Sequence, residues 1–405
     1  MMRKPQPSIA TLRLRIFPFL LAVSALFLLI PVTELPSFAQ TLTVLYSFSG
    51  GTDGAQPYAR LVPDVSGNAY GTTAVGGDLN ACPGLGCGVI FKLDKSGQYH
   101  VLYTFAGGVD GANPWSGLLR DSTGNLYGTT EAGGTAGFGT VFRLSRGGVK
   151  TTLYNFQSGQ DGAYPFGQLI SDEQGNLYGT TYRGGPADAG TVYKLSRSGE
   201  TVLYSFKRGS DGENPYAGLV RDGAGNLYGT TFGDGLTAYG TVFRVTPAGK
   251  ETVLHTFTGG ADGGFPYYGS LVLDPSRGLY GTTSFGGAHS FFGTVFNVNT
   301  AGQFNVVYSF TGGADGGQPN TSLTRDPAGN LYGATLGGGF FGHGTIFRVD
   351  SNGKETVIYS FPGGNSPANI NAPLIRDPAG NLYGTSSAGG NSGQGTVFKL
   401  APTVP

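Results

Sequence analysis

One short phrase, Gly-Asn-Leu-Tyr-Gly-Thr-Thr, recurs along this chain of 405 residues and constrains its fold more than any other feature. Clean copies span residues 124–130, 175–181 and 225–231. Looser copies bring the total to seven, and the central tyrosines are Tyr70, Tyr127, Tyr178, Tyr228, Tyr280, Tyr332 and Tyr383. Successive copies lie about 50 residues apart, and a fixed period of that length indicates one supersecondary unit stacked many times.

The composition favours strands joined by tight turns. Glycine supplies 73 of the 405 residues, well above the usual share of about 7%. Glycine weakens helices, and the many tyrosines and phenylalanines suit strands. The 25 basic and 25 acidic residues balance, and no lysine or arginine cluster follows the N-terminus. Nucleic acid is therefore not an expected partner.

Each repeat divides into four strands, as the copy that starts at Pro215 illustrates. We predict strands at 215–222, 227–231, 241–245 and 252–257, with glycine-rich turns between them. Four strands in about 50 residues make one blade of a β-propeller. The prediction is an all-β, seven-bladed β-propeller of four-stranded antiparallel blades over residues 40–405. A parallel β-helix, which needs a much shorter period, is the less favoured alternative.

An aspartate precedes the hairpin turn in every copy: Asp64, Asp121, Asp172, Asp222, Asp274, Asp326 and Asp377. An aspartate at the start of a turn accepts hydrogen bonds from backbone N–H groups. We therefore interpret these acids as turn caps and not as catalytic groups.

Two aromatic positions also recur. One lies in each third strand: Phe91, Phe142, Tyr193, Phe243, Phe296, Phe347 and Phe398. The other lies in each fourth strand: Phe48, Phe105, Phe156, Phe206, Phe257, Phe310 and Phe361. A tyrosine usually stands two residues before the second position, and His255 replaces it once. We expect the rings to fill the spaces between blades, where each buried ring stabilises the fold by roughly 1.5–3 kcal/mol.

The order of the phrases predicts how the ring closes. The chain opens with a fourth-strand phrase at Thr43–Phe48, and its last repeat phrase is the third-strand phrase at Gly395–Leu400. Pairing of these two segments would complete the last blade and cover two exposed sheet edges. The alternative is a blade that begins with Thr43–Phe48 as its inner strand.

The N-terminal segment has the order of a secretory signal. Basic residues, including Arg13 and Arg15, precede or flank an apolar run at 16–32, and the small residues Ser37 and Ala39 follow. We expect residues 1–39 to be a signal peptide cleaved before Gln40, which predicts a secreted or periplasmic protein without a membrane segment. An uncleaved anchor helix is the alternative, although the run is short for a membrane span.

The two cysteines, Cys82 and Cys87, lie in a loop that is longer than its counterpart in the second copy. Export makes a disulfide between them the expected state. Their spacing differs from a redox Cys-x-x-Cys motif, and two thiols without a nearby histidine make a poor zinc site.

The phrases Gly-Asn-Leu-Tyr-Gly-Thr-Thr, Gly-Thr-Val-Phe and Leu-Tyr-Ser-Phe resemble the tandem Gloeobacter/Verrucomicrobium (GloVer) repeat of exported bacterial proteins. The resemblance covers the chain after the N-terminal segment. It implies bacterial export and a propeller-like array, but no established activity, catalytic residues or cofactor. Members often carry C-terminal anchors, and none follows the last repeat in this sequence, which favours release. More distantly, Asp-x-x-Gly-Asn-Leu-Tyr resembles exported propellers of the NHL and streptogramin lyase types.

The loops that join the fourth strand to the next first strand, and the second strand to the third, should emerge on one face, where function concentrates. The former repeat Gly-Gly-x-Asp-Gly-x-x-Pro with the acids Asp53, Asp110, Asp161, Asp211, Asp262 and Asp315, and Ser366 in the seventh copy. Asp-Gly is a common turn pair. The alternative is a ring of carboxylates around the channel mouth that attracts Ca²⁺, although one acid per blade spreads the 6–8 ligands of calcium widely.

An aromatic residue follows the proline of this loop in five copies: Tyr58, Trp115, Phe166, Tyr216 and Tyr267. Asn320 and Asn371 take its place in the other two. These rings either pack between blades or line the channel entrance as a surface for carbohydrate, with Trp115 as the foremost ligand contact.

His289 and His343 lie in the second-to-third loops of adjacent copies. A metal-assisted lyase or hydrolase on this face would use them together. The favoured prediction is a non-catalytic, monomeric binding module for a polysaccharide or a cell-surface partner, without a resident cofactor. The alternatives are that enzyme and a purely structural extracellular protein.

Overall fold

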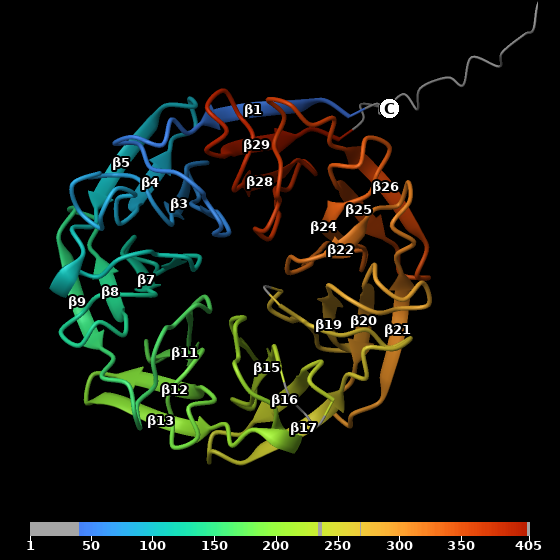
Figure 1. Cartoon of the computed structure of the whole chain (residues 1–405), viewed down its shortest axis with the longest axis horizontal. Helices are drawn as coiled ribbons and strands as arrows, with labels where there is room; N and C mark the ends of the chain where they lie inside the picture. The colour runs from blue at the N-terminus through green and yellow to red at the C-terminus, as the bar shows by residue number, and fades with distance from the viewer. Residues whose placement is uncertain (1–39, 234–236, 268, 403–405) are drawn as a thin grey trace, which may run out of the picture. The chain divides into compact units, whose positions relative to one another are not determined.

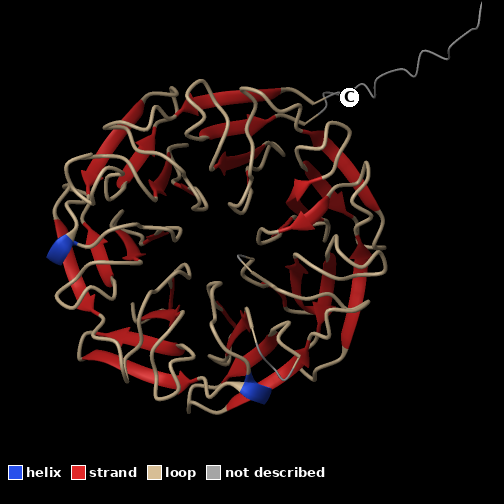
Figure 2. Ribbon diagram, in the orientation of Figure 1, coloured by secondary structure: helices blue, strands red, loops and turns tan. Residues whose placement is uncertain are grey.

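The computed structural model describes residues 40–233, 237–267 and 269–402, so the predicted signal peptide lies outside the described residues. Seven antiparallel sheets form a ring about a central axis (Figure 1). Six sheets have four strands, and one has a fifth, short strand. Two single-turn 3-10 helices, η1 (Gly108–Asp110) and η2 (Gly209–Asp211), lie at the rim (Figure 2). The structure confirms the predicted seven-bladed propeller.

The first four blades follow one another along the chain, each from its inner to its outer strand. Blade 1 consists of β2 (Val62–Pro63), β3 (Ala69–Thr73), β4 (Val89–Leu93) and β5 (Tyr99–Thr104). Blade 2 consists of β6 (Leu119–Arg120), β7 (Leu126–Thr130), β8 (Thr140–Leu144) and β9 (Lys150–Asn155). Blade 3 consists of β10 (Ile170–Ser171), β11 (Leu177–Thr181), β12 (Thr191–Ser196) and β13 (Gly199–Ser205). Blade 4 consists of β14 (Val220–Arg221), β15 (Leu227–Thr231), β16 (Thr241–Val245) and β17 (Glu251–Thr256).

The last three blades complete the ring. Blade 5 consists of β18 (Val272–Asp274), β19 (Gly278–Thr283), β20 (Thr294–Val298) and β21 (Phe304–Ser309). Blade 6 consists of β23 (Thr324–Arg325), β24 (Leu331–Gly337), β25 (Thr345–Val349), β26 (Glu355–Ser360) and the extra strand β22 (Gly317–Pro319), which pairs with β24. Blade 7 consists of β27 (Ile375–Arg376), β28 (Leu382–Ser386), β29 (Thr396–Leu400) and β1 (Leu42–Ser47).

The inner strands are shorter than predicted. In blade 4 the expected strand 215–222 is reduced to Val220–Arg221, whereas β15 and β16 have the predicted bounds. The segment before it is held by the neighbouring blade instead, because Thr180 of blade 3 donates a hydrogen bond to the carbonyl oxygen of Ala217 over 3.0 Å. Thr385 of blade 7 bonds the carbonyl of Ala59 in the same way over 3.1 Å. The segment before each inner strand therefore joins blades.

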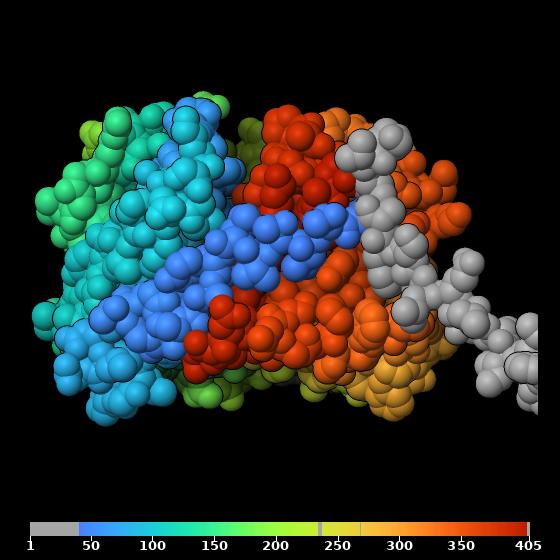
Figure 3. Space-filling model, turned by 90° about the horizontal axis from the view of Figure 1, so that it is seen from above, coloured from blue at the N-terminus to red at the C-terminus, as the bar shows by residue number. Residues whose placement is uncertain are grey.

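The N-terminal strand closes the ring as predicted. β1 pairs antiparallel with β29, from Leu42 opposite Leu400 to Ser47 opposite Thr396. It carries the same β-bulge that the fourth strands of the other blades carry. In Figure 3 the blue strand β1 runs along the outside of the red C-terminal blade. β1 is thus the outermost strand of blade 7, which rules out the alternative of an inner strand.

Buried aromatic rings join every blade to the next. The fourth-strand ring of one blade contacts the third-strand ring of the following blade at centroid distances of 5.0–6.0 Å, with the rings near perpendicular. The seven pairs are Phe48–Phe91, Phe105–Phe142, Phe156–Tyr193, Phe206–Phe243, Phe257–Phe296, Phe310–Phe347 and Phe361–Phe398. All these rings are fully buried. Edge-to-face pairs add about 0.5–1.5 kcal/mol each to the free energy of area burial.

The third-strand ring also explains the glycine that follows the tyrosine of the repeated phrase. A Cβ atom at Gly229 would lie 2.6 Å from the ring of Phe243, and one at Gly128 would lie 2.7 Å from the ring of Phe142. No side chain fits at these distances. The glycine therefore makes room for the core ring of its own blade.

The rest of the phrase forms a hydrogen-bonded turn around the preceding aspartate, as predicted. The carboxylate of Asp222 accepts hydrogen bonds from the backbone N–H groups of Ala224 and Asn226, over 3.0 and 2.8 Å. It also accepts bonds from the Asn226 side-chain amide and the Tyr228 hydroxyl, over 2.8 and 3.0 Å. Six of the seven copies repeat this pattern. The asparagine and tyrosine of the phrase are thus donors to one carboxylate.

These donors set the charge state of the acids. Burial alone would raise the pKa of Asp121, but hydrogen bonds from Asn125, Thr123 and Tyr127 lower it to about 2. An acid with a lowered pKa stabilises the fold above its unfolded pKa of about 3.9, and this stabilisation is lost as the pH falls through the lower value. We therefore expect these turns to lose stability when the protein is acidified.

We predict that Asp222→Ala lowers the free energy of unfolding by about 2–4 kcal/mol, because several donors lose their acceptor at once. Tyr228→Phe should cost only about 1 kcal/mol, since it removes one of these bonds. Urea unfolding followed by circular dichroism at neutral pH measures both. Equal losses in the two variants would show that the carboxylate is not the centre of the turn.

Candidate functional site

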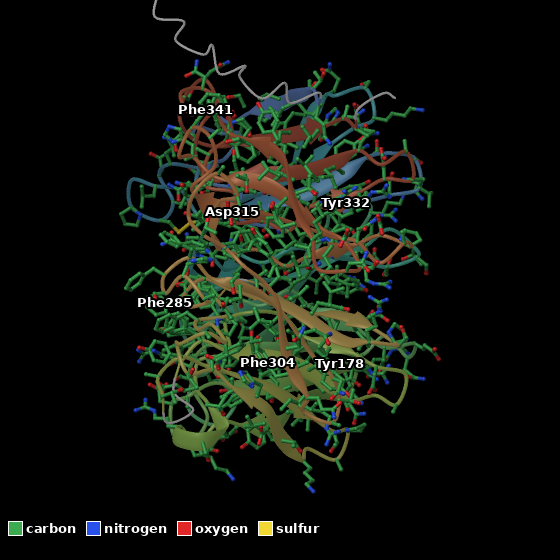
Figure 4. The ribbon with its side chains drawn as sticks, turned by 90° about the vertical axis from the view of Figure 1, so that its right-hand side faces the viewer. Tyr178, Phe285, Phe304, Asp315, Tyr332 and Phe341 are labelled. Carbon is green, nitrogen blue, oxygen red and sulfur yellow. A yellow bond between two sulfur atoms is a disulfide. The ribbon has the colours of Figure 1, made fainter. Side chains whose placement is uncertain are left out.

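The two faces of the ring differ. In Figure 4, Phe285 and Phe341, from second-to-third loops, lie toward one face, and Tyr178 and Tyr332, beside the aspartate turns, lie toward the other. The first face, which we call the elaborated face, carries the longer loops. Large exposed apolar side chains, such as Phe291 at 60% and Phe340 at 49% exposure, lie in its loops in blades 5 and 6.

A strained residue anchors each fourth-to-first loop on this face. The residue before the loop proline, or before Ile370 in the seventh copy, has a positive φ of 54–59° in all seven copies: Gln56, Asn113, Tyr164, Asn214, Phe265, Gln318 and Asn369. In six copies its backbone N–H donates a hydrogen bond to a carbonyl of the preceding second-to-third loop, over 2.7–2.9 Å. Asparagine tolerates this conformation, but an aromatic residue does so at a cost. The strain at Phe265 and Tyr164 fixes where their rings lie.

The predicted aromatic residues of the fourth-to-first loops lie around the axis. Tyr58, Trp115, Phe166 and Tyr216 line an axial cavity of about 60 Å³. Tyr58 and Trp115 pack at a centroid distance of 4.3 Å, and Tyr216 stacks between Phe166 and Tyr267 at 4.3 and 4.7 Å. We call these five residues the axial ring. The rings therefore pack on one another across neighbouring blades, and four of them also line the cavity.

Trp115 is oriented by an acid. Its indole Nε1–H donates a hydrogen bond to Oε2 of Glu131 over 2.6 Å. Burial raises the pKa of Glu131, and this hydrogen bond opposes the increase. The polar atom of the indole is therefore satisfied within the protein, and Trp115 offers a ligand only its ring.

A larger hollow lies beside the axial ring on the elaborated face. It has a volume of about 350 Å³ and is lined by Phe232, Phe265, Tyr267, Ser284, Phe285, Gln318, Asn320 and Leu336. We call it the aromatic hollow. Ring contacts join Tyr267 to Phe232 at 4.8 Å, Phe232 to Phe265 at 5.2 Å, and Phe265 to Phe285 at 5.8 Å. The axial ring and the aromatic hollow therefore form one continuous aromatic surface.

Polar groups at the edge of the aromatic hollow are incompletely bonded. The side chain of Asn320 is 6% exposed, and its Oδ1 atom has no hydrogen-bond partner among the described residues. Its Nδ2 donates to Oδ1 of Asn371 over a long 3.3 Å. A buried polar atom without a partner costs about 1–3 kcal/mol. The hydrogen-bonding capacity of this oxygen is therefore unused within the described residues.

The predicted ring of loop acids does not surround the channel mouth. Asp110 and Asp211 accept hydrogen bonds from the hydroxyls of Tyr103 and Tyr204, which lie on outer strands, over 2.7 and 2.6 Å. Asp262 makes the corresponding contact with His255, at 3.1 Å. Asp53, Asp161 and Asp315 follow the same pattern. The tyrosine or histidine seven residues earlier holds each carboxylate at an outer strand, which corrects the alternative of a ring of acids around the channel mouth.

A further position on the outer strands faces these acids. In blade 2 the ammonium group of Lys150 lies 2.8 Å from Asp110 and is almost fully buried. Glu200, Glu251 and Glu355 occupy the equivalent position in blades 3, 4 and 6. Burial, and then the charge of the neighbouring aspartate, raises the pKa of each glutamate to about 7. One carboxylate oxygen of each is buried without a partner in the described part of the chain.

The structure gives the two candidate histidines different surroundings. The imidazole of His343 lies against Gly363, where a Cβ atom would be 2.5 Å from its Nε2. Tyr239 and Phe292, which stand at the same repeat position, cover Gly259 and Gly312 in the same way. His289 is exposed at the tip of its loop. Within the described residues no hydrogen bond joins the two, so His343 has a packing role that does not involve His289.

Cys82 and Cys87 form a disulfide, and both sulfur atoms lie over Gly107, at the loop position that Tyr239 covers in blade 4. No group of three or more His, Cys, Asp or Glu side chains in the described ranges is arranged to hold a metal ion. No helix within residues 40–233, 237–267 and 269–402 is long and apolar enough to cross a membrane.

Fold and repeat together define a propeller built from glycine-rich tandem repeats. The model of the Gloeobacter/Verrucomicrobia repeat matches residues 32–235, 82–288 and 222–404. The chain therefore belongs to this repeat family, as its phrases predict. No curated protein matches it.

Solved structures share the architecture at low sequence identity. The extracellular domain of a putative hybrid two-component system from B. thetaiotaomicron is 13% identical with a TM-score of 0.59, over 90% of this chain and 40% of that one. The extracellular domain of a putative one-component system from the same organism is 14% identical with a TM-score of 0.57, over 90% and 42%. A gluconolactonase from Xanthomonas campestris is 15% identical with a TM-score of 0.46, over 89% of each chain. This chain spans about two fifths of the first two proteins, so the likeness shows the fold alone.

The buried glutamates predict an unusual pH dependence. Because folding raises their pKa to about 7, they favour the fold at low pH and destabilise it as the pH rises through 7. The triple variant E200Q/E251Q/E355Q should melt several degrees higher than the wild-type protein at pH 8 and at the same temperature near pH 4.5. Differential scanning calorimetry at both pH values measures this, with E213Q as control, because Glu213 is half-buried and forms an ion pair with the exposed Arg208. A gain of equal size at both pH values would contradict the assignment.

Proposed function

We propose that this protein is a non-catalytic binding module that takes a carbohydrate on the elaborated face, along the axial ring and the aromatic hollow. The observation that carries the proposal is the continuous set of ring contacts from Phe166 through Tyr267 to Phe285. The core of the propeller does not require an aromatic surface at the mouth of a cavity. A ligand with flat apolar faces requires such a surface for binding.

The chemistry of this surface suits a sugar. Aromatic faces carry negative charge density and attract the C–H groups on the face of a pyranose. Amide and hydroxyl groups from Gln318, Asn320 and Ser284 border the same hollow and can exchange hydrogen bonds with sugar hydroxyls. Charged side chains are absent from the lining of the aromatic hollow. The combination selects a ligand that is both apolar on its faces and polar at its edges.

Backbone strain supports a functional reading of the aromatic hollow. Phe265 holds a φ of 54°, a conformation that costs a residue without a small polar side chain about 1–3 kcal/mol. Gln318, with a φ of 59°, lines the hollow from the next blade. Asparagine stands at this position in three copies and would relieve the strain. The two strained residues bring a ring and an amide to one side of the hollow.

The other two predicted functions lack an observation of this kind. The enzymatic alternative requires His289 and His343 to act together, and His343 packs on Gly363 as non-catalytic rings do in other blades. A purely structural role does not explain the unbonded Asn320 oxygen or the backbone strain at Phe265. The disulfide is consistent with an extracellular or periplasmic location, and the predicted signal peptide adds to that expectation.

We predict that Phe285→Ala weakens binding to a glycan by about tenfold or more and leaves the melting temperature nearly unchanged, because this half-buried ring lies at the surface of the hollow. Trp115→Ala should also weaken binding. A glycan array with the wild-type protein supplies the ligand, and calorimetric titration gives the affinities.

Phe341→Ala is the matched control, since this exposed ring lies on the same face outside the aromatic hollow. Its affinity should equal that of the wild-type protein. A parallel loss of affinity and melting temperature in Phe285→Ala would favour a packing role for the ring. Capture of proteins but no glycans by the intact module would contradict the carbohydrate assignment.

A further inference from the structure

One position of the repeat lines the axial cavity. It lies two residues after the axial-ring position, or three in blade 5, and it carries small or uncharged residues in six blades: Gly117, Gln168, Gly218, Ser270, Ser322 and Pro373. In blade 1 it carries Arg60. A single charged side chain therefore lies among uncharged ones on the axis of the propeller.

The direction of the Arg60 side chain follows from the burial of its neighbours. Ala59 and Leu61 are 3% and 1% exposed and pack into the blade. Tyr58 and Arg60, on either side of Ala59, retain solvent contact and line the cavity. Alternate residues of an extended segment face opposite sides. Arg60 therefore points to the axis. It lies farther from the elaborated face than the axial ring, because it follows Tyr58 in a segment that runs inward from that face.

Arg60 has no counter-charge. No hydrogen bond, ion pair or ring contact of its guanidinium occurs among the described residues, and no acid lines the axial cavity. Lys150 and Arg325, by contrast, each lie beside an acid, Asp110 at 2.8 Å and Asp274 at 2.7 Å. Arg60 is exposed to solvent at the cavity, although the surrounding protein atoms lower the pKa of its guanidinium, and arginine stays charged at neutral pH. An unpaired cation in such a place favours an anionic ligand.

We propose that the axial cavity is a carboxylate site and that the carbohydrate of the proposed function is an acidic polysaccharide with uronic acid residues. The guanidinium fork of Arg60 matches a carboxylate through two parallel hydrogen bonds. This inference rests on the proposed function and names the class of its ligand.

The size of the cavity agrees with a carboxylate. About 60 Å³ is the space of roughly two water molecules, which a carboxylate fills and a whole pyranose exceeds. The sugar ring then stays at the level of the axial ring, against Trp115 or Phe166, while its carboxylate reaches Arg60. Ser270, Ser322 and Gln168 supply polar atoms beside it. Neutral neighbouring sugars continue across the aromatic hollow.

The test compares oligogalacturonides with the same oligomers after methyl esterification, which removes the charge and keeps the sugar. The wild-type protein should bind the acid form at least 30-fold more tightly than the ester, with an affinity that falls as salt is added. Arg60→Gln should reduce the affinity for the acid form to that for the ester. Arg183→Gln, which removes an exposed arginine of the same face, should leave it unchanged.

A second variant keeps the test interpretable if Arg60→Gln does not fold. Gln168→Glu keeps Arg60 and places a carboxylate of the same shape in the cavity, so it should weaken binding of the acid form as well. Equal affinity of the wild-type protein for acid and ester, or full affinity in both variants, overturns this inference. Tighter binding of sulfated glycans than of uronates overturns the carboxylate assignment. If the protein binds neutral glycans and Arg60→Gln does not change that binding, this inference is wrong and the proposed function stands. If the protein binds no glycan, both are wrong.

Discussion

The contact between an outer phenylalanine of one blade and the third-strand ring of the next is the interaction on which the rest of the structure depends. It occurs at all seven interfaces with nearly the same distance and angle. A single blade has two apolar faces and cannot bury both alone, so each ring finds its partner only in a neighbour. The glycine before the paired threonines follows from the same need, since it leaves space for the third-strand ring. The axial loops are then held at a fixed distance from the axis.

Function in this molecule arises where a repeat departs from its pattern. Five blades carry an aromatic residue at the position of the axial ring, and two neighbouring blades carry asparagine. One side of the axis is therefore lined by aromatic rings and the other by amide groups. Phe265 stands where asparagine is common, and Arg60 stands where the other blades have small or uncharged side chains. Each departure costs stability or leaves a group unpaired. All of them lie on the axis or on the elaborated face, while the aspartate turns on the opposite face are nearly uniform.

Much of the fold could be predicted from the sequence, because each strand and turn pattern occurs seven times. Strands 227–231 and 241–245 were limited by turn residues, and the offset between phrases at the two ends predicted the pairing of β1 with β29. The pattern predicts a strand from Pro215, because an extended apolar run has the same sequence pattern whether it pairs in a sheet or lines an axis. The turn role favoured for the loop acids agrees with their backbone hydrogen bonds, but their contact with a tyrosine or histidine seven residues earlier could not be predicted from the repeat alone. Phe232, Phe285 and Arg60 were missed, although Arg60 breaks its column of small residues when the repeats are aligned.

The shared last blade has a consequence for how the molecule is made. β1 is synthesised before blades 1 to 6, and its partner β29 is synthesised after them. At usual rates of synthesis this leaves the first strand without its ladder for roughly tens of seconds. Blades 1 to 6 have all their strands locally, so they can form in sequence as an open arc. The final pairing then joins β1 to β29, two segments far apart in the sequence, and the arc becomes a closed ring. This ring cannot open at blade 7 without breaking the hydrogen bonds between these two strands.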